Sequence, residues 1–306
     1  MRWRLPNRAM TGMAIVCVAL LVNGCEAKVW GSPPTAENTP QAPVSAPEAP
    51  LPEAPPNQSA APFDGLDSRV RQATADAAKS GANIETVVLD RDTGQIVSNG
   101  VNRPFPIASV AKLFIADDLL LQESQGKTTL SAADRASLDV MLRSSDDSAA
   151  QMFWNRSGGN AILARVKARY GLPGTTAPSN GHWDVTTSTA SDLVHYYDML
   201  LAGTGGLPPE QANVIIGDLA QSTPTGTDGY PQRFGIPEGL YAEPVAVKQG
   251  WFCCWSGANQ LHVSTGIIGP EHRYVMAISS LDPTSAAAAR TNMTQAVKTM
   301  FPGGRI

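Results

Sequence analysis

Strand-like runs occur in two groups, one near residue 85 and one after residue 240, with a long helical stretch between them. The first group is two short runs joined by an Asp-Thr-Gly turn, and the second is three runs separated by turn residues. The sheet must therefore be built from both ends of the chain, which predicts an α+β domain in two lobes. We expect strands over 84–90, 95–100, 241–252, 259–269 and 273–281. We expect helices over 66–82, 108–124, 134–154 (as shorter runs), 160–170, 191–203 and 285–300.

The first 24 residues have the pattern of a secretory signal. Three arginines precede Thr11–Val22, an apolar run that is too short to span a membrane comfortably. The following Val-Asn-Gly-Cys resembles the lipobox of bacterial lipoproteins, which implies cleavage before Cys25 and lipidation of that residue. The alternative is an uncleaved anchor helix. In both cases we expect a domain that is tethered to the cell membrane on its extracytoplasmic side.

The next segment lacks the composition of a folded domain. Residues 31–62 contain ten prolines and almost no large apolar side chain, so they cannot bury enough surface to fold. An extended Pro-rich chain rises about 3.1 Å per residue, so this one would span about 100 Å. We therefore expect a lipidated, disordered linker over 25–62 and a folded domain over 63–306.

Charge and cysteine content exclude several classes of partner. Cleavage of the signal removes three arginines and leaves 20 basic and 27 acidic residues, a formal charge of −7, with no basic cluster. Nucleic acid is therefore not an expected partner. The folded domain keeps only Cys253 and Cys254, and neither these nor the four histidines have metal-ligand spacing. We expect no metal and no cofactor.

A candidate nucleophile and base lie near the start of the apolar helix expected over 108–124. Ser109 and Lys112 are three residues apart, which places their Cβ atoms about 5–6 Å apart on one helix face. The free N–H groups of a helix start favour developing negative charge, and a neutral lysine accepts a hydroxyl proton. Taken alone, the pattern is more simply explained by a helix N-cap serine and a solvated lysine.

Two further motifs follow in order. Ser144–Ala150 reads Ser-Ser-Asp-Asp-Ser-Ala-Ala, and Lys248-Gln249-Gly250 lies on the first strand of the late group. With Ser-Val-Ala-Lys before them, and two strands and a helix after them, they resemble the serine β-lactamase and penicillin-binding-protein fold. The resemblance covers residues 66–301, and within it the chain most resembles the LppW-like mycobacterial lipoproteins. It implies a five-stranded antiparallel sheet flanked by helices, plus an all-helical lobe.

The resemblance also implies a role for each matching position. Ser109 would be the nucleophile and Lys112 its general base. Ser145 would pass a proton to the leaving nitrogen, and Lys248 would help to bind the substrate carboxylate. The backbone N–H groups of Ser109 and Trp251 would form the oxyanion hole. The substrate-binding positions would be Asp147, Gln249, Gly250 and Trp251.

Three of these positions differ from the family pattern or narrow the site. Asp147 stands where the family has asparagine; a carboxylate cannot donate to a substrate carbonyl, and beside Lys112 it would stabilise the ammonium form. The alternative is that Asp147 points at a helix end and takes no part. Gln249 replaces a serine or threonine, although its amide can still donate to a substrate. The bulky Trp251 would narrow the groove.

Two elements of class A β-lactamases are missing. Those enzymes activate the deacylating water with a glutamate, but the corresponding segment Gly171–Ser188 contains Asp184 as its only acid. Loss of a general base commonly removes about 10²- to 10⁴-fold in rate, so fast β-lactam hydrolysis is not expected. Only 36 positions separate Ser109 from Ser145, which indicates that a loop overhanging the site is absent.

The adjacent cysteines allow two states. Across a trans peptide their Cα atoms would lie about 3.8 Å apart, which is shorter than a disulfide usually spans, and in a regular strand their side chains point to opposite faces. In a turn, a vicinal disulfide between Cys253 and Cys254 can form. The sequence is compatible both with two free thiols and with a disulfide at Cys253 and Cys254.

Three functions are compatible with these residues. The first is a serine acyl-transferase that β-lactams or D-Ala-D-Ala peptides of peptidoglycan acylate slowly. The second is a catalytically inactive binding or structural protein of the cell envelope, and the third is a true β-lactamase. Whether the site is active, and the oligomeric state, stay open at the level of sequence.

Overall fold

The structure is a computed structural model that describes residue 63 and residues 65–306. The predicted signal sequence, Cys25 and the proline-rich linker lie outside the described residues. Within the described part of the chain, no helix is long and apolar enough to cross a membrane.

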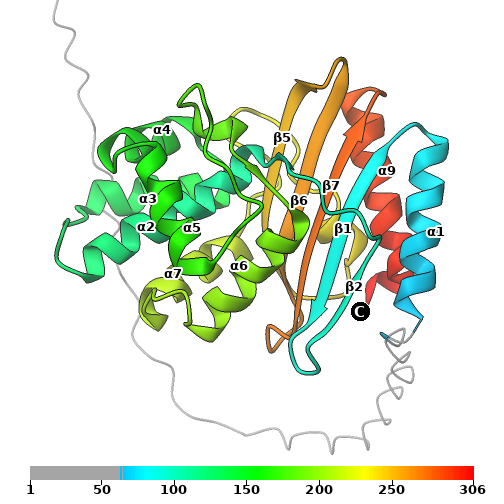
Figure 1. The fold of residues 1–306 in the computed structure, drawn as a ribbon, viewed down its shortest axis with the longest axis horizontal. Coiled ribbons are helices and arrows are strands. Elements are labelled where there is room, and N and C mark those ends of the chain that lie inside the picture. The colour runs from blue at the N-terminus through cyan, green and yellow to red at the C-terminus, as the bar shows by residue number, and fades with distance from the viewer. Residues whose placement is uncertain (1–62, 64) are drawn as a thin grey trace, which may run out of the picture. The chain divides into compact units, whose positions relative to one another are not determined.

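A single five-stranded sheet forms the centre of the domain (Figure 1). Its order is β2-β1-β7-β6-β5, and every neighbouring pair is antiparallel. The strands are β1 (Asn83–Asp90), β2 (Gln95–Ser98), β5 (Val245–Trp255), β6 (Asn259–Ile268) and β7 (Tyr274–Asp282). Strands from both ends of the chain therefore meet in one sheet, as the order of elements predicted.

The two faces of the sheet are covered by different parts of the chain. The terminal helices α1 (Leu66–Lys79) and α9 (Ala286–Met300) lie side by side on one face, at the right of Figure 1. The helical lobe covers the other face. Its helices are α2 (Lys112–Ser124), α3 (Ala132–Arg143), α4 (Asp147–Arg156), α5 (Asn160–Tyr170), α6 (Ala190–Ala202) and α7 (Pro209–Ala220).

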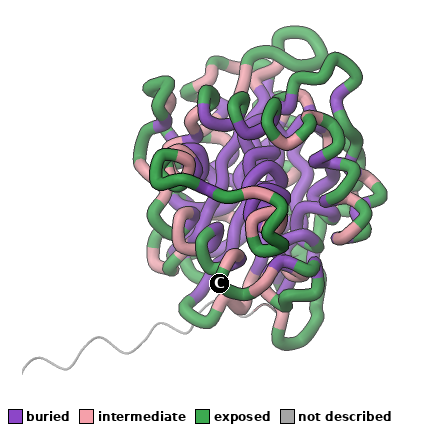
Figure 2. Tube along the Cα trace, turned by 90° about the vertical axis from the view of Figure 1, so that its left-hand side faces the viewer, coloured by how far each residue is buried: buried purple, intermediate pink, exposed green. Residues whose placement is uncertain are grey.

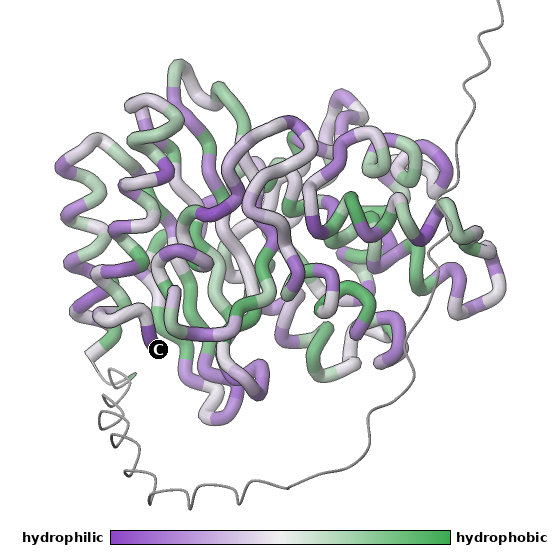
Figure 3. The backbone as a smooth tube through the Cα atoms, turned by 180° about the vertical axis from the view of Figure 1, so that it is seen from behind, coloured by the Kyte–Doolittle hydropathy of each residue, from purple (hydrophilic) through white to green (hydrophobic). Residues whose placement is uncertain are grey.

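Alternation along the strands divides the apolar core in two. Val87 and Leu89 of β1 face the helical lobe, whereas Ile84 and Val88 face the terminal helices. Successive side chains of a strand point to opposite faces, so β1, β5, β6 and β7 contribute to both clusters. Figure 2 shows the buried segments at the centre of the domain, and Figure 3 shows hydrophobic segments along the inner strands and helices.

The structure contains elements that the sequence analysis did not predict. Helix α7 buries Ala212, Ile215, Ile216 and Leu219, a helical spacing that was readable in the sequence. The other additions are the short α8 (Ile236–Gly239), the strands β3 (Phe105–Pro106) and β4 (Thr187–Ser188), and the 3₁₀ turns Ala108–Ala111, Trp183–Val185 and Pro302–Gly304.

The shorter helical runs expected over 134–154 are α3 and α4, and they are separated where Ser145 has a positive φ of 58° and Asp146 caps α4 by accepting a hydrogen bond from the Ala149 N–H. One predicted boundary was wrong. The strand expected from residue 241 begins at Val245, directly after Pro244, which has no N–H to give to a sheet.

A buried carboxylate holds the helical lobe together. Asp117 of α2 is fully buried, is ion-paired with Arg169, and accepts hydrogen bonds from the hydroxyls of Tyr170 and Tyr196. Burial raises the pKa of Asp117, while Arg169 and the hydroxyls oppose that rise. The network joins α2 to α5 and α6.

We expect Asp117→Ala to lower the free energy of unfolding by about 3–5 kcal/mol, because it leaves the partly buried Arg169 without its counter-charge. Urea unfolding monitored by circular dichroism measures this change. Asp76→Ala is the matched control, since Asp76 pairs with Lys79 on an exposed face of α1, and it should unfold nearly as the parent does. An equally small loss for both variants would contradict the role given to Asp117.

Candidate active site

A strained turn presents Ser109. Strand β3 leads directly into the turn Ala108–Ala111, and the N–H of Ile107 donates to the carbonyl of Thr186 over 2.9 Å. Ala108 has a φ of 47°, a left-handed conformation that costs a non-glycine residue about 1–3 kcal/mol and is concentrated at functional sites. Ser109 follows with 8% of its surface exposed. The turn therefore places a nearly buried hydroxyl at the start of α2.

Lys112 lies one turn further along and contacts Ser109, as the spacing predicted. Its Nζ is 2.8 Å from the Ser109 Oγ, 2.6 Å from the Ser145 carbonyl oxygen and 2.6 Å from Asp147 Oδ1. The side chain is fully buried. Trp183 covers it, with the centre of one ring 4.7 Å from the Nζ.

These contacts fit either protonation state of the Lys112 amine. A neutral lysine has two N–H donors and one lone pair, whereas an ammonium has three donors. In the neutral form, the two N–H groups donate to the Ser145 carbonyl oxygen and to Asp147 Oδ1, which are the two shortest contacts. The lone pair is then available to accept the proton of the Ser109 hydroxyl. Burial lowers the pKa of Lys112, and the Asp147 carboxylate opposes that lowering. The geometry therefore allows Lys112 to accept the Ser109 proton.

Ser145 connects the two lysines. Its Oγ lies 3.2 Å from the Lys112 Nζ and 2.9 Å from the Lys248 Nζ. Burial strongly lowers the pKa of Lys248, and the nearby Lys112 lowers it further. The four residues that the family resemblance marked as catalytic, Ser109, Lys112, Ser145 and Lys248, thus form one connected set.

Gly250 brings strand β5 against the Ser109 turn. A Cβ at this position would lie 2.5 Å from the Ile107 carbonyl oxygen, 3.2 Å from the Ala108 Cβ and 3.3 Å from the Ser109 nitrogen. Only glycine permits this approach. It places the following residue, Trp251, next to the turn, where the family pattern expects the two oxyanion-hole N–H groups.

Asp147 contacts the base. It is the first residue of α4 and is not the helix cap, because Asp146 accepts the capping hydrogen bond. Its side chain is 71% exposed, yet Oδ1 reaches the fully buried Lys112 amine. The alternative in which Asp147 points only at the helix end is therefore wrong.

Gln249 does not face the cleft. Both of its amide hydrogens are used beneath the strand, where Nε2 donates to the carbonyls of Gln232 over 3.0 Å and Phe234 over 2.6 Å. Alternation along β5 places its side chain on the sheet face opposite to that of Lys248. The expectation that this amide donates to a substrate is corrected: Gln249 is 1% exposed and secures the segment before α8.

A cleft of about 530 Å³ opens over Ser109. Its wall includes Trp251, whose ring stacks on Tyr230 at 4.9 Å between centroids and whose indole N–H donates to Asp228 Oδ2 over 3.1 Å. Trp251 thus lies beside the site, as expected. Asp228 and Tyr230 were not predicted, because the turn that carries them matches no motif in a single sequence.

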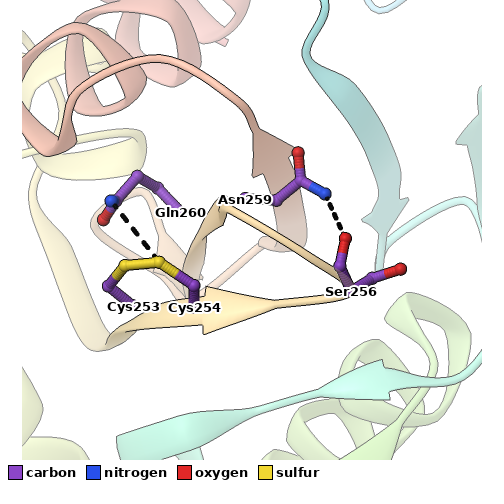
Figure 4. The surroundings of a disulfide bond; sticks show 5 residues. All are labelled: Cys253, Cys254, Ser256, Asn259 and Gln260. Atoms are coloured by element: carbon purple, nitrogen blue, oxygen red, sulfur yellow. Dashed lines mark hydrogen bonds between the residues drawn. A yellow bond between two sulfur atoms is a disulfide. The ribbon is translucent and has the colours of Figure 1, made fainter.

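The cysteines lie at the far end of β5. The structure joins Cys253 and Cys254 in a disulfide, and their peptide bond is cis. Cys253 pairs with Gln260 and Trp255 pairs with Asn259, so the register shifts and Cys254 is left unpaired in a bulge. This irregularity interrupts the strand alternation that argued against a bridge. Gln260 approaches the disulfide, and Asn259 donates to the Ser256 carbonyl (Figure 4).

No carboxylate of the Gly171–Ser188 segment contacts Lys112. The aromatic ring of Trp183 faces the amine instead. Asp184, the only acid in the segment, is exposed and lines a separate hollow of about 610 Å³ beyond Asp147. Among the described residues, no group of three or more histidine, cysteine or acidic side chains could hold a metal ion.

Comparison with known proteins identifies the family. No protein-family model matches the chain. Two proteins named as lipoprotein LppW, from Mycobacterium bovis and Mycobacterium tuberculosis, are each 56% identical over 312 residues, which covers 98% of this chain and 99% of theirs. The chain belongs to the LppW lipoprotein family. The resemblance to LppW-like proteins is therefore confirmed, and the family name agrees with the lipobox-like sequence at Cys25.

Comparison with solved structures shows the fold of this chain. The extended-spectrum β-lactamase TLA-3 superposes with a TM-score of 0.63 at 13% identity, over 77% of this chain and 97% of that one. A β-lactamase from Chitinophaga pinensis gives 0.62 at 15% identity, over 76% and 97%. The predicted β-lactamase-like α+β fold is confirmed.

His262 of β6 is a buried base behind the cleft wall. Its Nε2 lies 2.7 Å from the Tyr230 hydroxyl, and its Nδ1 has no partner. Burial and, to a smaller extent, Arg290 lower the pKa of His262 to about 4, and the nearby Asp282 opposes this lowering. An unfolded histidine titrates near pH 6.5. Between those values the unfolded chain therefore binds a proton that the folded chain does not.

We expect this difference to remove about 3 kcal/mol of stability as the pH falls from 6.5 to 4. Urea unfolding at a series of pH values measures it, and His262→Gln should abolish that part of the slope. His195→Gln, at an exposed position of α6, is the control and should keep the slope. A slope that persists in His262→Gln would show that another group is responsible.

Proposed function

We propose that this chain is an envelope lipoprotein whose Ser109 is acylated by β-lactams or D-Ala-D-Ala peptides, and that the acyl-enzyme is hydrolysed slowly. The observation that carries the proposal is the buried Lys112 amine 2.8 Å from the Ser109 Oγ. Burial lowers the pKa of that amine, which favours the form that accepts a proton.

The residues support a complete acylation step. The Ser109 Oγ bonds to the carbonyl carbon while its proton moves to the Lys112 Nζ. The N–H groups of Ser109 and Trp251 stabilise the negative charge on the carbonyl oxygen. As the C–N bond breaks, the proton passes from Lys112 through the Ser145 hydroxyl to the leaving nitrogen. A β-lactam nitrogen stays tethered in the opened ring, whereas a peptide loses its terminal D-alanine.

Slow hydrolysis follows from what surrounds Lys112. The segment that carries the deacylating glutamate in class A enzymes contributes the ring of Trp183 here. A water molecule beside the acyl group would then lack a base, and loss of general-base catalysis commonly costs about 10²- to 10⁴-fold in rate. The acyl-enzyme is therefore expected to accumulate.

The site would work at a distance from a membrane. The proposal includes cleavage of the signal, lipidation of Cys25 and a proline-rich tether over 25–62 that holds the domain on the extracytoplasmic side. The candidate ligands there are a peptidoglycan stem peptide or a β-lactam. Nucleic acid is not proposed as a partner.

One observation favours a second function, that of a binding or structural protein without catalysis. Asp147 Oδ1 lies 2.6 Å from the Lys112 Nζ and stabilises the protonated lysine, which cannot act as a base. In that reading the cleft binds an envelope ligand and Ser109 stays unmodified.

Consumption of a penicillin by the full chain in detergent separates these functions. We expect a burst close to one equivalent, followed by very slow further loss. Many turnovers would indicate a true β-lactamase with an unrecognised water activator. No loss above that of the free penicillin, at any concentration that saturates the cleft, would favour the binding protein.

A further inference from the structure

We propose that the cleft beside Ser109 prefers ligands that carry a protonated amine over ligands that carry a carboxylate. The inference deepens the proposed function, because it rests on Ser109 as the acylated residue and adds the class of acyl donor. It differs from the expectation that Lys248 and its neighbours recognise a substrate carboxylate.

The charged side chains that line the cleft are both acidic. The lining residues are Ser109, Asp147, Asp228, Tyr230, Trp251, Phe252, Cys253, Gln260 and Ala286. Asp147 and Asp228 are exposed, and no lysine, arginine or histidine stands beside them in this lining. A carboxylate ligand would therefore meet two acidic side chains and no basic one in this lining.

The donors that would hold a carboxylate are already occupied. Both amide hydrogens of Gln249 go to backbone carbonyls beneath the strand. The Trp251 indole N–H goes to Asp228. Lys248 is 1% exposed and contacts the Ser145 hydroxyl, so reaching a carboxylate would break an existing hydrogen bond.

The aromatic wall offers a surface that attracts cations. Trp251 and Tyr230 are stacked with an angle of 10° between their planes. The Arg290 guanidinium already lies 4.7 Å from the centre of the Tyr230 ring, so this stack holds one cation in the structure. Aromatic faces beside carboxylates are the usual recognition elements for ammonium groups. Asp228 accepts a hydrogen bond from the Trp251 indole N–H, so a carboxylate and an aromatic ring lie side by side in this wall.

Arg290 does not reverse this charge. Its guanidinium packs on Tyr230, and Arg290 is absent from the lining of the cleft. The charged groups in the lining are therefore Asp147 and Asp228, and the ion pair with Lys112 partly neutralises the charge of Asp147. Asp228 is therefore the residue expected to determine the preference.

Three forms of one penicillin test this inference. Benzylpenicillin is anionic, its methyl ester is neutral and its diethylaminoethyl ester is cationic, while the reactive ring is the same. The rate of the Ser109 adduct is followed by intact-protein mass spectrometry on the full chain in detergent. Each rate is divided by the alkaline hydrolysis rate of the same compound, which corrects for ring reactivity.

We expect the cationic ester to react fastest and benzylpenicillin slowest, with a difference of at least about threefold at low salt that shrinks as salt is added. Asp228→Asn should reduce the preference. Asp67→Asn, which makes the same change of charge in the first turn of α1, should keep it. Equal rates, or a faster reaction of benzylpenicillin, would overturn the inference even though Ser109 is acylated.

If no compound forms an adduct, the proposed acylation is contradicted but the charge preference is not, and binding must then be measured without reaction. Calorimetric titration of the Ser109→Ala chain with the same three compounds then measures the charge preference directly. Tighter binding of the cationic ester, weakened by Asp228→Asn, would support the inference. Equal binding, tighter binding of benzylpenicillin, or no binding of any of them would overturn it.

Discussion

Replacing Gly250 by alanine is expected to slow the acylation of Ser109 about 100-fold. The new Cβ would lie 2.5 Å from the Ile107 carbonyl oxygen, so strand β5 must move away from the Ser109 turn. The N–H groups of Ser109 and Trp251 would then no longer converge on one oxygen. Removal of a single oxyanion donor commonly costs about 10²- to 10³-fold.

The measurement is the rate of adduct formation with a fluorescent penicillin, at a temperature where circular dichroism shows the variant to be folded. Overpacking is also expected to cost about 1–3 kcal/mol of stability, so the two readouts must be taken together. Gly217→Ala is the control, because a Cβ in that turn of α7 meets no atom within 4 Å. A folded Gly250→Ala chain that reacts at the parent rate would show that the close approach is not needed.

The second large effect is expected from Asp147→Asn, which should speed the acylation of Ser109 about tenfold at neutral pH. The carboxylate contacts the Lys112 Nζ and raises the pKa of that lysine against the effect of burial. Its removal lowers the pKa further, so more of the lysine is neutral at a given pH. The rise of the acylation rate with pH should therefore shift to lower pH.

The pH profile also distinguishes the lowered pKa of Lys112 from a second possible cause of faster acylation, the new hydrogen-bond donor. An asparagine amide can donate to a substrate carbonyl, which would raise the rate at every pH without moving the midpoint. Asp67→Asn is the matched control, because it makes the same change of charge in the first turn of α1, at a residue that is not among the charged groups acting on Lys112. An unchanged rate and midpoint in Asp147→Asn would remove the carboxylate as an explanation for weak activity.

The architecture was largely predictable because it depends on local periodicity. β-branched runs bounded by turn residues marked all five strands of the sheet, and Asn160–Tyr170 was predicted with its exact bounds. Shorter helical runs were predicted over 134–154, but the position of the break between α3 and α4 was not, because the left-handed backbone of Ser145 is a conformation that favours glycine and has no signal at a serine.

Only those residues of the candidate site that belong to the three ordered motifs could be predicted from the sequence. Ser109, Lys112, Ser145 and Lys248 were named from their order along the chain, and the structure brings them within hydrogen-bond distance of one another. The direction of the Gln249 side chain was not predictable, because it depends on carbonyls of Gln232 and Phe234 that approach from a loop. Nothing in the sequence placed the ring of Trp183 over Lys112.

The proposed function requires Ser109 to be a working nucleophile. Its most direct test is intact-protein mass spectrometry of the full chain after incubation with a fluorescent penicillin, beside the Ser109→Ala variant. We expect one stable adduct that maps to the peptide containing Ser109 and is lost in the variant. An unmodified chain, or an adduct that forms equally in Ser109→Ala, would contradict it.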